Sequence, residues 1–122
     1  MVLTEADNSR NLLTIIHAER VDPEQIEAGF EKVKILLADM KPGCRVLADL
    51  SRLESMDPAC APLMGQVMDL FNAKGVAMVV RVIPDPKRDI GLNILSLFHY
   101  SRKVRIVTVK SLDEATKLLT KR

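Results

Sequence analysis

The chain has 122 residues, of which 48% are hydrophobic and 28% are charged, and this is the size and composition of one globular domain spanning 1–122. Its net charge of +2, from 18 basic and 16 acidic residues, is too small to indicate a nucleic-acid-binding protein, which needs a concentrated basic face. The sequence has no leader-like apolar start, no run near the ~20 residues of a membrane span and no CxxC spacing between its two cysteines, so we expect a cytoplasmic protein with free thiols, without a membrane span or a zinc site.

The first half of the chain predicts a strand, a helix and a second strand. Residues 12–18 are rich in Ile and Leu, which is typical of a strand. Asp22 stands before a proline and should begin a helix, because Asp is a good N-cap and Gln25 can complete a capping box. The Pro-Gly pair at 42–43 should end this helix, and the apolar run 45–50 predicts a strand buried on both faces.

The second half repeats this alternation. Asp57 also precedes a proline and should begin a helix that ends at Gly75. The run 76–83 is the most hydrophobic of the chain and predicts the central strand. Asp85, again before a proline, should begin a third helix over 87–101.

A last strand and a last helix complete the pattern, over 104–109 and from the capping box that begins at Ser111. Strand–helix units of this length cannot pair as hairpins, so their strands must lie mostly parallel, with right-handed crossovers. We therefore predict an α/β domain with a mostly parallel sheet of four to five strands and about four crossover helices. Residues 1–10 could add a short edge strand to this sheet.

The motifs also follow one another in an informative order. A strand ending in Asp-Leu-Ser at 49–51 precedes Met56 and Asp57 at a helix start, Gly75 precedes the next strand, and the Ser111 capping box comes last. In order and spacing the chain resembles the STAS domain family, the group of bacterial anti-sigma-factor antagonists and of the cytoplasmic tails of sulfate transporters. This resemblance implies a single SpoIIAA-like (STAS) domain that binds a protein partner and is not an enzyme.

The chain departs from this family where phosphorylated members carry their switch. The resemblance implies a phosphate-accepting serine or threonine just after the aspartate that corresponds to Asp57. Here residues 58–61 read Pro-Ala-Cys-Ala, so no hydroxyl is available. Ser51 and Ser55 lie upstream and do not match the family position.

Oxygen-bearing side chains should gather at the carboxyl edge of the sheet, where parallel sheets bind their ligands. Asp49, Asp57 and Asp85 fall there, and clustered carboxylates suit Mg²⁺. However, Asp57 and Asp85 each precede a proline, and helix capping explains them better. Asp49 has no capping role and stays a functional candidate, while we predict no metal site and no cofactor.

Cys60 and the two histidines are the remaining candidates for chemistry. Cys60 should lie in a first helical turn, where the helix dipole can lower a thiol pKa, but a small packed residue is the better interpretation. His17 should end a strand and His99 a helix, and neither has a Ser or Cys partner nearby in the sequence. The five glycines form no phosphate-binding loop.

These observations predict a non-enzymatic regulatory module whose partner is an anti-sigma factor, a kinase-like protein, another regulator or a second copy of the chain. In the family, the second helix and its start meet the partner, and methionines on this helix would suit adaptable contacts. The predicted partner-binding residues are Asp49, Ser51, Ser55, Met56, Asp57, Pro58, Ala59, Cys60, Met64 and Met68. Two alternatives remain: a small-molecule or lipid-binding domain of the same fold, and a magnesium-dependent or thiol enzyme that uses Asp49 with Cys60 or a histidine.

Overall fold

The computed structural model describes residues 1–85, 99–101 and 103–120. The third helix that the sequence predicts, over 87–101, lies almost wholly outside the described residues. The elements in chain order are β1 (Val2–Asp7), β2 (Leu12–Val21), α1 (Pro23–Ala38), β3 (Arg45–Met56), the 3-10 helix η1 (Pro58–Cys60), α2 (Ala61–Lys74), β4 (Met78–Val82), β5 (Arg105–Val109) and α4 (Leu112–Thr120).

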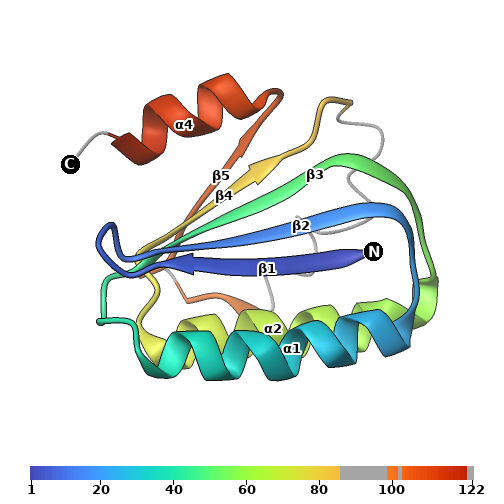
Figure 1. The fold of residues 1–122 in the computed structure, drawn as a ribbon, viewed down its shortest axis with the longest axis horizontal. Helices are drawn as coiled ribbons and strands as arrows, with labels where there is room; N and C mark the ends of the chain where they lie inside the picture. The colour runs from blue at the N-terminus through green and yellow to red at the C-terminus, as the bar shows by residue number, and fades with distance from the viewer. Residues whose placement is uncertain (86–98, 102, 121–122) are drawn as a thin grey trace.

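The five strands lie side by side in the order β1-β2-β3-β4-β5. β1 pairs antiparallel with β2, and the other three neighbouring pairs are parallel, which confirms the predicted mostly parallel sheet. Right-handed crossovers between successive neighbours all turn the same way, so the connecting helices fall on one face. Accordingly α1 and α2 lie next to each other on one face of the sheet, while α4 covers the other face (Figure 1).

Among the described residues, the local signals at the helix ends are confirmed with one exception, and the helix start predicted at Asp85 is not tested because residues 86–98 lie outside them. Asp22 accepts a hydrogen bond from the Gln25 backbone N at 2.9 Å, and Gln25 Oε1 accepts one from the Asp22 backbone N at 3.1 Å, which completes the predicted capping box. Gly75 ends α2 with a φ of 76°, a left-handed conformation that glycine adopts without strain. α1 ends at Ala38, before the pair at 42–43, because its last turn closes with 3-10-type hydrogen bonds.

The hydrophobic core lies on both faces of the sheet. Successive residues of a strand point to opposite faces, so Val79 packs toward α1 and α2 while Val80 packs toward α4. This burial on both sides explains why the run 76–83 is apolar almost throughout. The larger layer contains Leu13, Ile15, Val33, Leu37, Val46, Phe71 and Val79, and the smaller one contains Leu12, Val80, Val82, Val109, Ala115 and Leu119.

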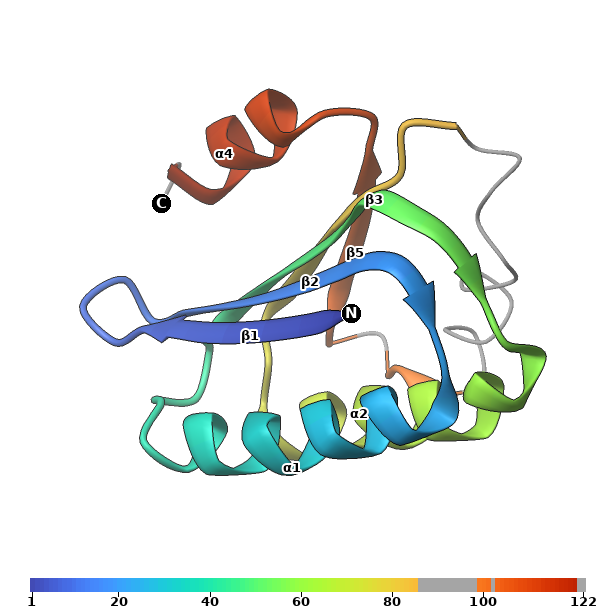
Figure 2. The ribbon, with the colours of Figure 1, turned by 45° about the vertical axis from the view of Figure 1, so that its right-hand side comes forward.

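β2 and β3 are longer than the sequence predicts. We expected strands over 12–18 and 45–50, but the two remain paired as far as Val21 and Met56, with two register shifts on the way. Continued pairing satisfies the backbone groups of both segments, which a loop would leave to water. The paired ends curve toward the ends of α1 and α2 (Figure 2), so residues 51–56 form part of the sheet and not of a loop.

Candidate functional site

A hollow lies at the carboxyl edge of the sheet, between the end of β3 and the segment that follows β4. Its volume is about 190 Å³. Ser51, Ser55 and Asp85, all expected near this edge, line it together with Glu54. The carboxyl edge of a parallel sheet is the usual position of binding sites in such folds, since successive loops converge there. Leu50, Leu53, Ile83 and Pro84 form the remainder of the wall.

Asp49 lies beside this hollow but is already engaged. Its side chain is 5% exposed, and its Oδ1 accepts hydrogen bonds from the Ser51 backbone N at 2.9 Å and from Ser51 Oγ at 2.6 Å. The carboxylate therefore closes a local turn within β3. Within residues 1–85, 99–101 and 103–120, no three His, Cys, Asp or Glu side chains come together around a possible metal position.

Asp57 caps a helix, as expected, although the first helical turn is the short η1. Its Oδ1 accepts a hydrogen bond from the Ala59 backbone N at 2.9 Å. Asp57, Pro58 and Ala59 are exposed, and Met56 is half-buried. These residues follow Ser55, the last residue of β3 that lines the hollow, directly along the chain. Glu54 and Asp85, which line the hollow, are also exposed.

The remaining predicted partner-binding residues face inward. Cys60 is completely buried, and its Sγ lies 3.8 Å from the Val21 carbonyl oxygen. Burial raises the pKa of the Cys60 thiol, and the carboxylates of Asp57 and Asp22 raise it further, so the thiolate is disfavoured. Met68 is 3% exposed and Met64 is half-buried, and both contribute to an interior cavity.

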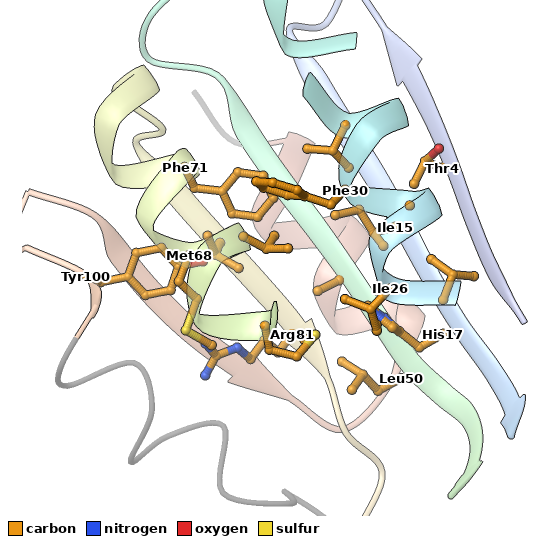
Figure 3. Close-up of a pocket in the computed structure, with 17 residues that line it drawn as sticks. Thr4, Ile15, His17, Ile26, Phe30, Leu50, Met68, Phe71, Arg81 and Tyr100 are labelled. Atoms are coloured by element: carbon orange, nitrogen blue, oxygen red, sulfur yellow. The ribbon is translucent and has the colours of Figure 1, made fainter. Parts of the chain in front are cut away.

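This cavity lies between the sheet and the two helices α1 and α2, and its volume is about 50 Å³ (Figure 3). Its wall is mainly aliphatic and aromatic, with Phe30 from α1, Phe71 from α2 and Tyr100 from the segment before β5. The sequence analysis did not predict it. The available signal was Arg81, a lone charged residue inside the most hydrophobic run of the chain.

Four side chains with polar groups line the cavity, namely Thr4, His17, Arg81 and Tyr100. His17 is 5% exposed and Arg81 is 3% exposed, and Thr4 Oγ1 is buried. Burial lowers the pKa of His17 to about 4, the positive N-terminus acts in the same direction, and Asp49 opposes them. The imidazole is therefore uncharged at neutral pH. Burial raises the pKa of Tyr100, which a side-chain hydrogen bond from Arg81 partly offsets.

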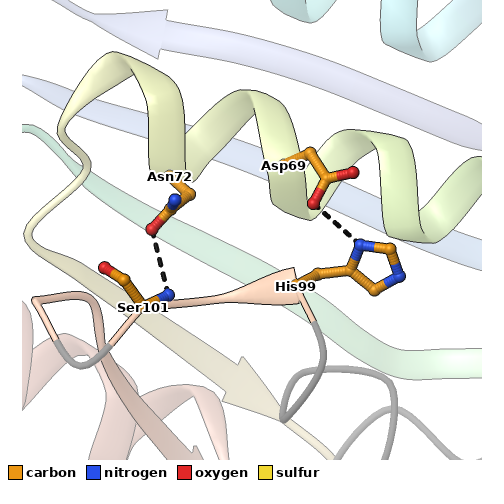
Figure 4. Close-up of polar contacts among 4 residues, drawn as sticks. All are labelled: Asp69, Asn72, His99 and Ser101. Atoms are coloured by element: carbon orange, nitrogen blue, oxygen red, sulfur yellow. Dashed lines mark hydrogen bonds and ion pairs between the residues drawn. The ribbon is translucent and has the colours of Figure 1, made fainter.

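His99 lies away from both the hollow and the cavity wall. Its Nδ1 is 2.7 Å from Asp69 Oδ1 on α2, and the Ser101 backbone N donates to Asn72 Oδ1 at 3.0 Å (Figure 4). These two contacts attach residues 99–101 to the side of α2. The histidine thus has a structural role.

None of the helices among the described residues is long and apolar enough to cross a membrane.

Comparison with known proteins identifies the fold. No family model and no curated protein matches the sequence. Among solved structures, an uncharacterized protein of the DUF3478 family with a SpoIIAA-like fold, from Shewanella loihica PV-4, superposes with a TM-score of 0.73 at 13% identity, over 98% of this chain and 92% of that one.

Two regulators of known type have the same architecture. SpoIIAA, a Bacillus cell fate determinant solved in its phosphorylated form, gives a TM-score of 0.65 at 15% identity, over 98% of this chain and 99% of that one. An anti-sigma factor antagonist from Mycobacterium paratuberculosis gives 0.63 at 16% identity, over 99% and 94%. The predicted SpoIIAA-like (STAS) fold is therefore confirmed.

Proposed function

We propose that this chain is a non-enzymatic regulatory module of the cytoplasm that binds a partner protein at the carboxyl edge of its sheet. The binding surface consists of the hollow between β3 and β4 and the adjoining exposed start of η1. Its residues are Ser51, Glu54, Ser55, Met56, Asp57, Pro58, Ala59 and Asp85. The fold shared with anti-sigma factor antagonists supports this reading.

The observation that carries the proposal is the composition of this edge. Four polar and four apolar side chains line a hollow of about 190 Å³, which is small for a cofactor but suited to a protruding side chain of a partner. The two charged residues of this lining, Glu54 and Asp85, are both acidic. A partner with Lys or Arg side chains on its contact surface would be complementary to them.

Phosphorylation at the start of the second helix is not part of this proposal. Residues 58–61 carry no hydroxyl, and Ser51 Oγ donates its hydrogen bond to Asp49. Regulation would therefore depend on the amounts of the two proteins or on another signal. The engaged Asp49 carboxylate and the raised pKa of Cys60 also argue against catalysis at this edge.

The test begins with affinity capture from extracts of the source cells, followed by titration of the purified captured protein by calorimetry. Glu54→Lys reverses one charge at the hollow, and Glu27→Lys makes the same change at an exposed position of α1 as a matched control. We expect Glu54→Lys to weaken binding at least about tenfold and Glu27→Lys to leave it unchanged. Failure to capture a protein selectively, or equal affinities of both variants, would contradict the proposal.

The same titration distinguishes a heterologous partner from a second copy of the chain. If the chain itself occupies this edge, the wild-type protein should dimerise in light scattering, and Glu54→Lys should shift it to the monomer. A monomeric wild type that binds a captured regulator agrees with the proposal as stated.

A further inference from the structure

The cavity between the sheet and the helices α1 and α2 contains polar atoms that nothing in the protein satisfies. Thr4 Oγ1 and His17 Nδ1 are buried and have no hydrogen-bond partner among the described residues. Most buried polar groups of folded proteins are hydrogen-bonded, because leaving them unpaired is costly. An occupant of the cavity would supply the missing partner.

These two side chains lie on the same face of the sheet. Thr4 pairs with Ile15 and Val2 pairs with His17 across the β1–β2 ladder, so the threonine and the histidine are diagonal neighbours on one face. Both line the cavity. A small polar group in the cavity could bond to the Thr4 hydroxyl.

A small residue on the sheet leaves space for the cavity. Thr4, Ile15, Ala48 and Arg81 form one row across four strands, and the short side chain of Ala48 leaves space in the middle of this row. Gly29 on the opposite wall does not add to this space, because a Cβ there would meet Val2 Cγ1 at 3.0 Å. Larger side chains would normally fill such a space, since close packing stabilises a core.

The charges of the wall indicate an uncharged occupant. Thr4 is neutral, and His17 is neutral at pH 7 because burial lowers its pKa to about 4. Arg81 stands three strands away from Thr4, roughly 14 Å at the usual strand spacing, and it already bonds to Tyr100. The N-terminal ammonium, whose charge also lowers the pKa of His17, already donates to the carbonyl oxygens of Ala18 and Arg20 and to Gln25 Oε1. A carboxylate at Thr4 would therefore gain no unengaged counterion, which is unfavourable.

We propose that this cavity binds a small, uncharged, mainly apolar molecule that carries one hydroxyl group, with the hydroxyl bonded to Thr4 Oγ1. Phe30 and Phe71 of the cavity wall (Figure 3) would contact the apolar part of the molecule. The volume of about 50 Å³ exceeds that of one water molecule but is below that of a full ligand pocket. Met64 and Met68 form the adaptable wall that moves to enlarge it.

The experiment uses three probes with the same ring, namely benzyl alcohol, toluene and benzoate, titrated into the protein and followed by NMR. We expect benzyl alcohol to saturate a site that shifts the methyl signals of Met64 and Met68 and the ring signals of His17. Toluene should bind more weakly because it has no hydroxyl, and benzoate should bind least.

Thr4→Val removes the hydroxyl and keeps the shape of the side chain. We expect this variant to bind benzyl alcohol about five- to tenfold more weakly than the wild type, which corresponds to the loss of one hydrogen bond. The affinity for toluene should not change. Thr108→Val makes the same change at an exposed position of β5 and should alter neither affinity. Ala48→Val narrows the cavity and should abolish binding of both probes, which provides a second test if Thr4→Val folds poorly.

Three outcomes would overturn the proposal. One is the absence of a saturable response to any probe, which would mean that water alone occupies the cavity. Another is tighter binding of benzoate than of benzyl alcohol. The third is an equal decrease in the affinities for benzyl alcohol and toluene in the Thr4→Val variant. None of these results bears on the partner surface at the hollow, which Glu54→Lys tests separately.

Discussion

His17 is an imidazole that the fold keeps in its uncharged form. The side chain is 5% exposed and lies between the sheet and α1, among apolar residues of the cavity wall (Figure 3). Burial lowers its pKa from 6.5 to about 4, and the neighbouring carboxylate of Asp49 offsets only part of this effect. In the unfolded chain the same group would titrate near its ordinary value.

The lowered pKa of His17 predicts a loss of stability in acid. Between pH 6.5 and about pH 4 the unfolded chain binds a proton that the folded protein does not, so the free energy of unfolding should fall as the pH decreases through this window. This contribution is fully present above pH 6.5 and amounts to about 3 kcal/mol. Urea unfolding measured from pH 7 to pH 4 would give the slope for the wild type and for His17→Leu.

Carboxylates also titrate in acid, and comparison with His17→Leu separates their effect on stability from that of the histidine. We expect the stability of His17→Leu to fall less steeply than that of the wild type over this window, whatever its stability at pH 7. Parallel curves for the two proteins would show that folding does not lower the pKa of His17. An NMR titration of the His17 ring protons measures the same pKa directly and does not depend on the variant.

At the scale of the elements, α2 contains Gly65, and the missing side chain at this position leaves room for the ring of His99. A Cβ built on Gly65 would lie 2.7 Å from His99 Nε2 and 2.8 Å from His99 Cε1. The imidazole can therefore rest on the helix only while residue 65 has no side chain, and from there it reaches Asp69 (Figure 4).

This contact predicts that Gly65→Ala and His99→Ala are coupled. Alanine is better than glycine inside a helix by up to about 1 kcal/mol, but in the wild type its methyl group would push His99 away from Asp69. We expect Gly65→Ala to leave stability unchanged or lower it in the wild type, and to raise it by about 1 kcal/mol when His99 is already alanine. Unfolding of the four proteins measures the coupling, and strictly additive effects would contradict the prediction.

The elements also show how far the sequence predicts this fold. Asp22, Gly75 and Ser111 are confirmed as helix signals because capping and left-handed turns depend on a few adjacent residues. The paired extension of β3 as far as Met56 was not predicted, since it depends on β2, a segment distant in sequence. The strand–helix alternation predicted the mostly parallel pairing correctly. The prediction that the run 76–83 forms the central strand was wrong, because it forms β4, next to the edge strand β5.

The candidate sites were predicted less completely than the fold. Glu54 and Asp85 come together only because β3 is long and the segment after β4 turns beside it. The cavity is lined by Thr4 and Ala48. Whether such residues border a cavity depends on which side chains pack opposite them, and the sequence does not show this. An apolar periodicity predicts that a residue is buried, but not whether the space next to it is filled.

For the molecule as a whole, the reactivity of the two cysteines can show whether different parts of the core unfold together. Cys44 is 2% exposed and belongs to the main core cluster, while Cys60 is completely buried in a separate cluster with Val21 and Ile26. Burial raises the pKa of both thiols. Neither can react with a thiol reagent until the chain around it opens.

If the two core clusters form one cooperative unit, both thiols should become reactive together. We expect Cys44→Ala and Cys60→Ala, which retain one thiol each, to be labelled by a disulfide reagent with the same denaturant dependence as global unfolding, once corrected for each variant's stability. Earlier labelling of Cys60 in the Cys44→Ala protein would contradict this expectation, because it would mean that the edge at η1 opens while the rest of the sheet stays folded. Circular dichroism measured on the same samples supplies the global midpoint for this comparison.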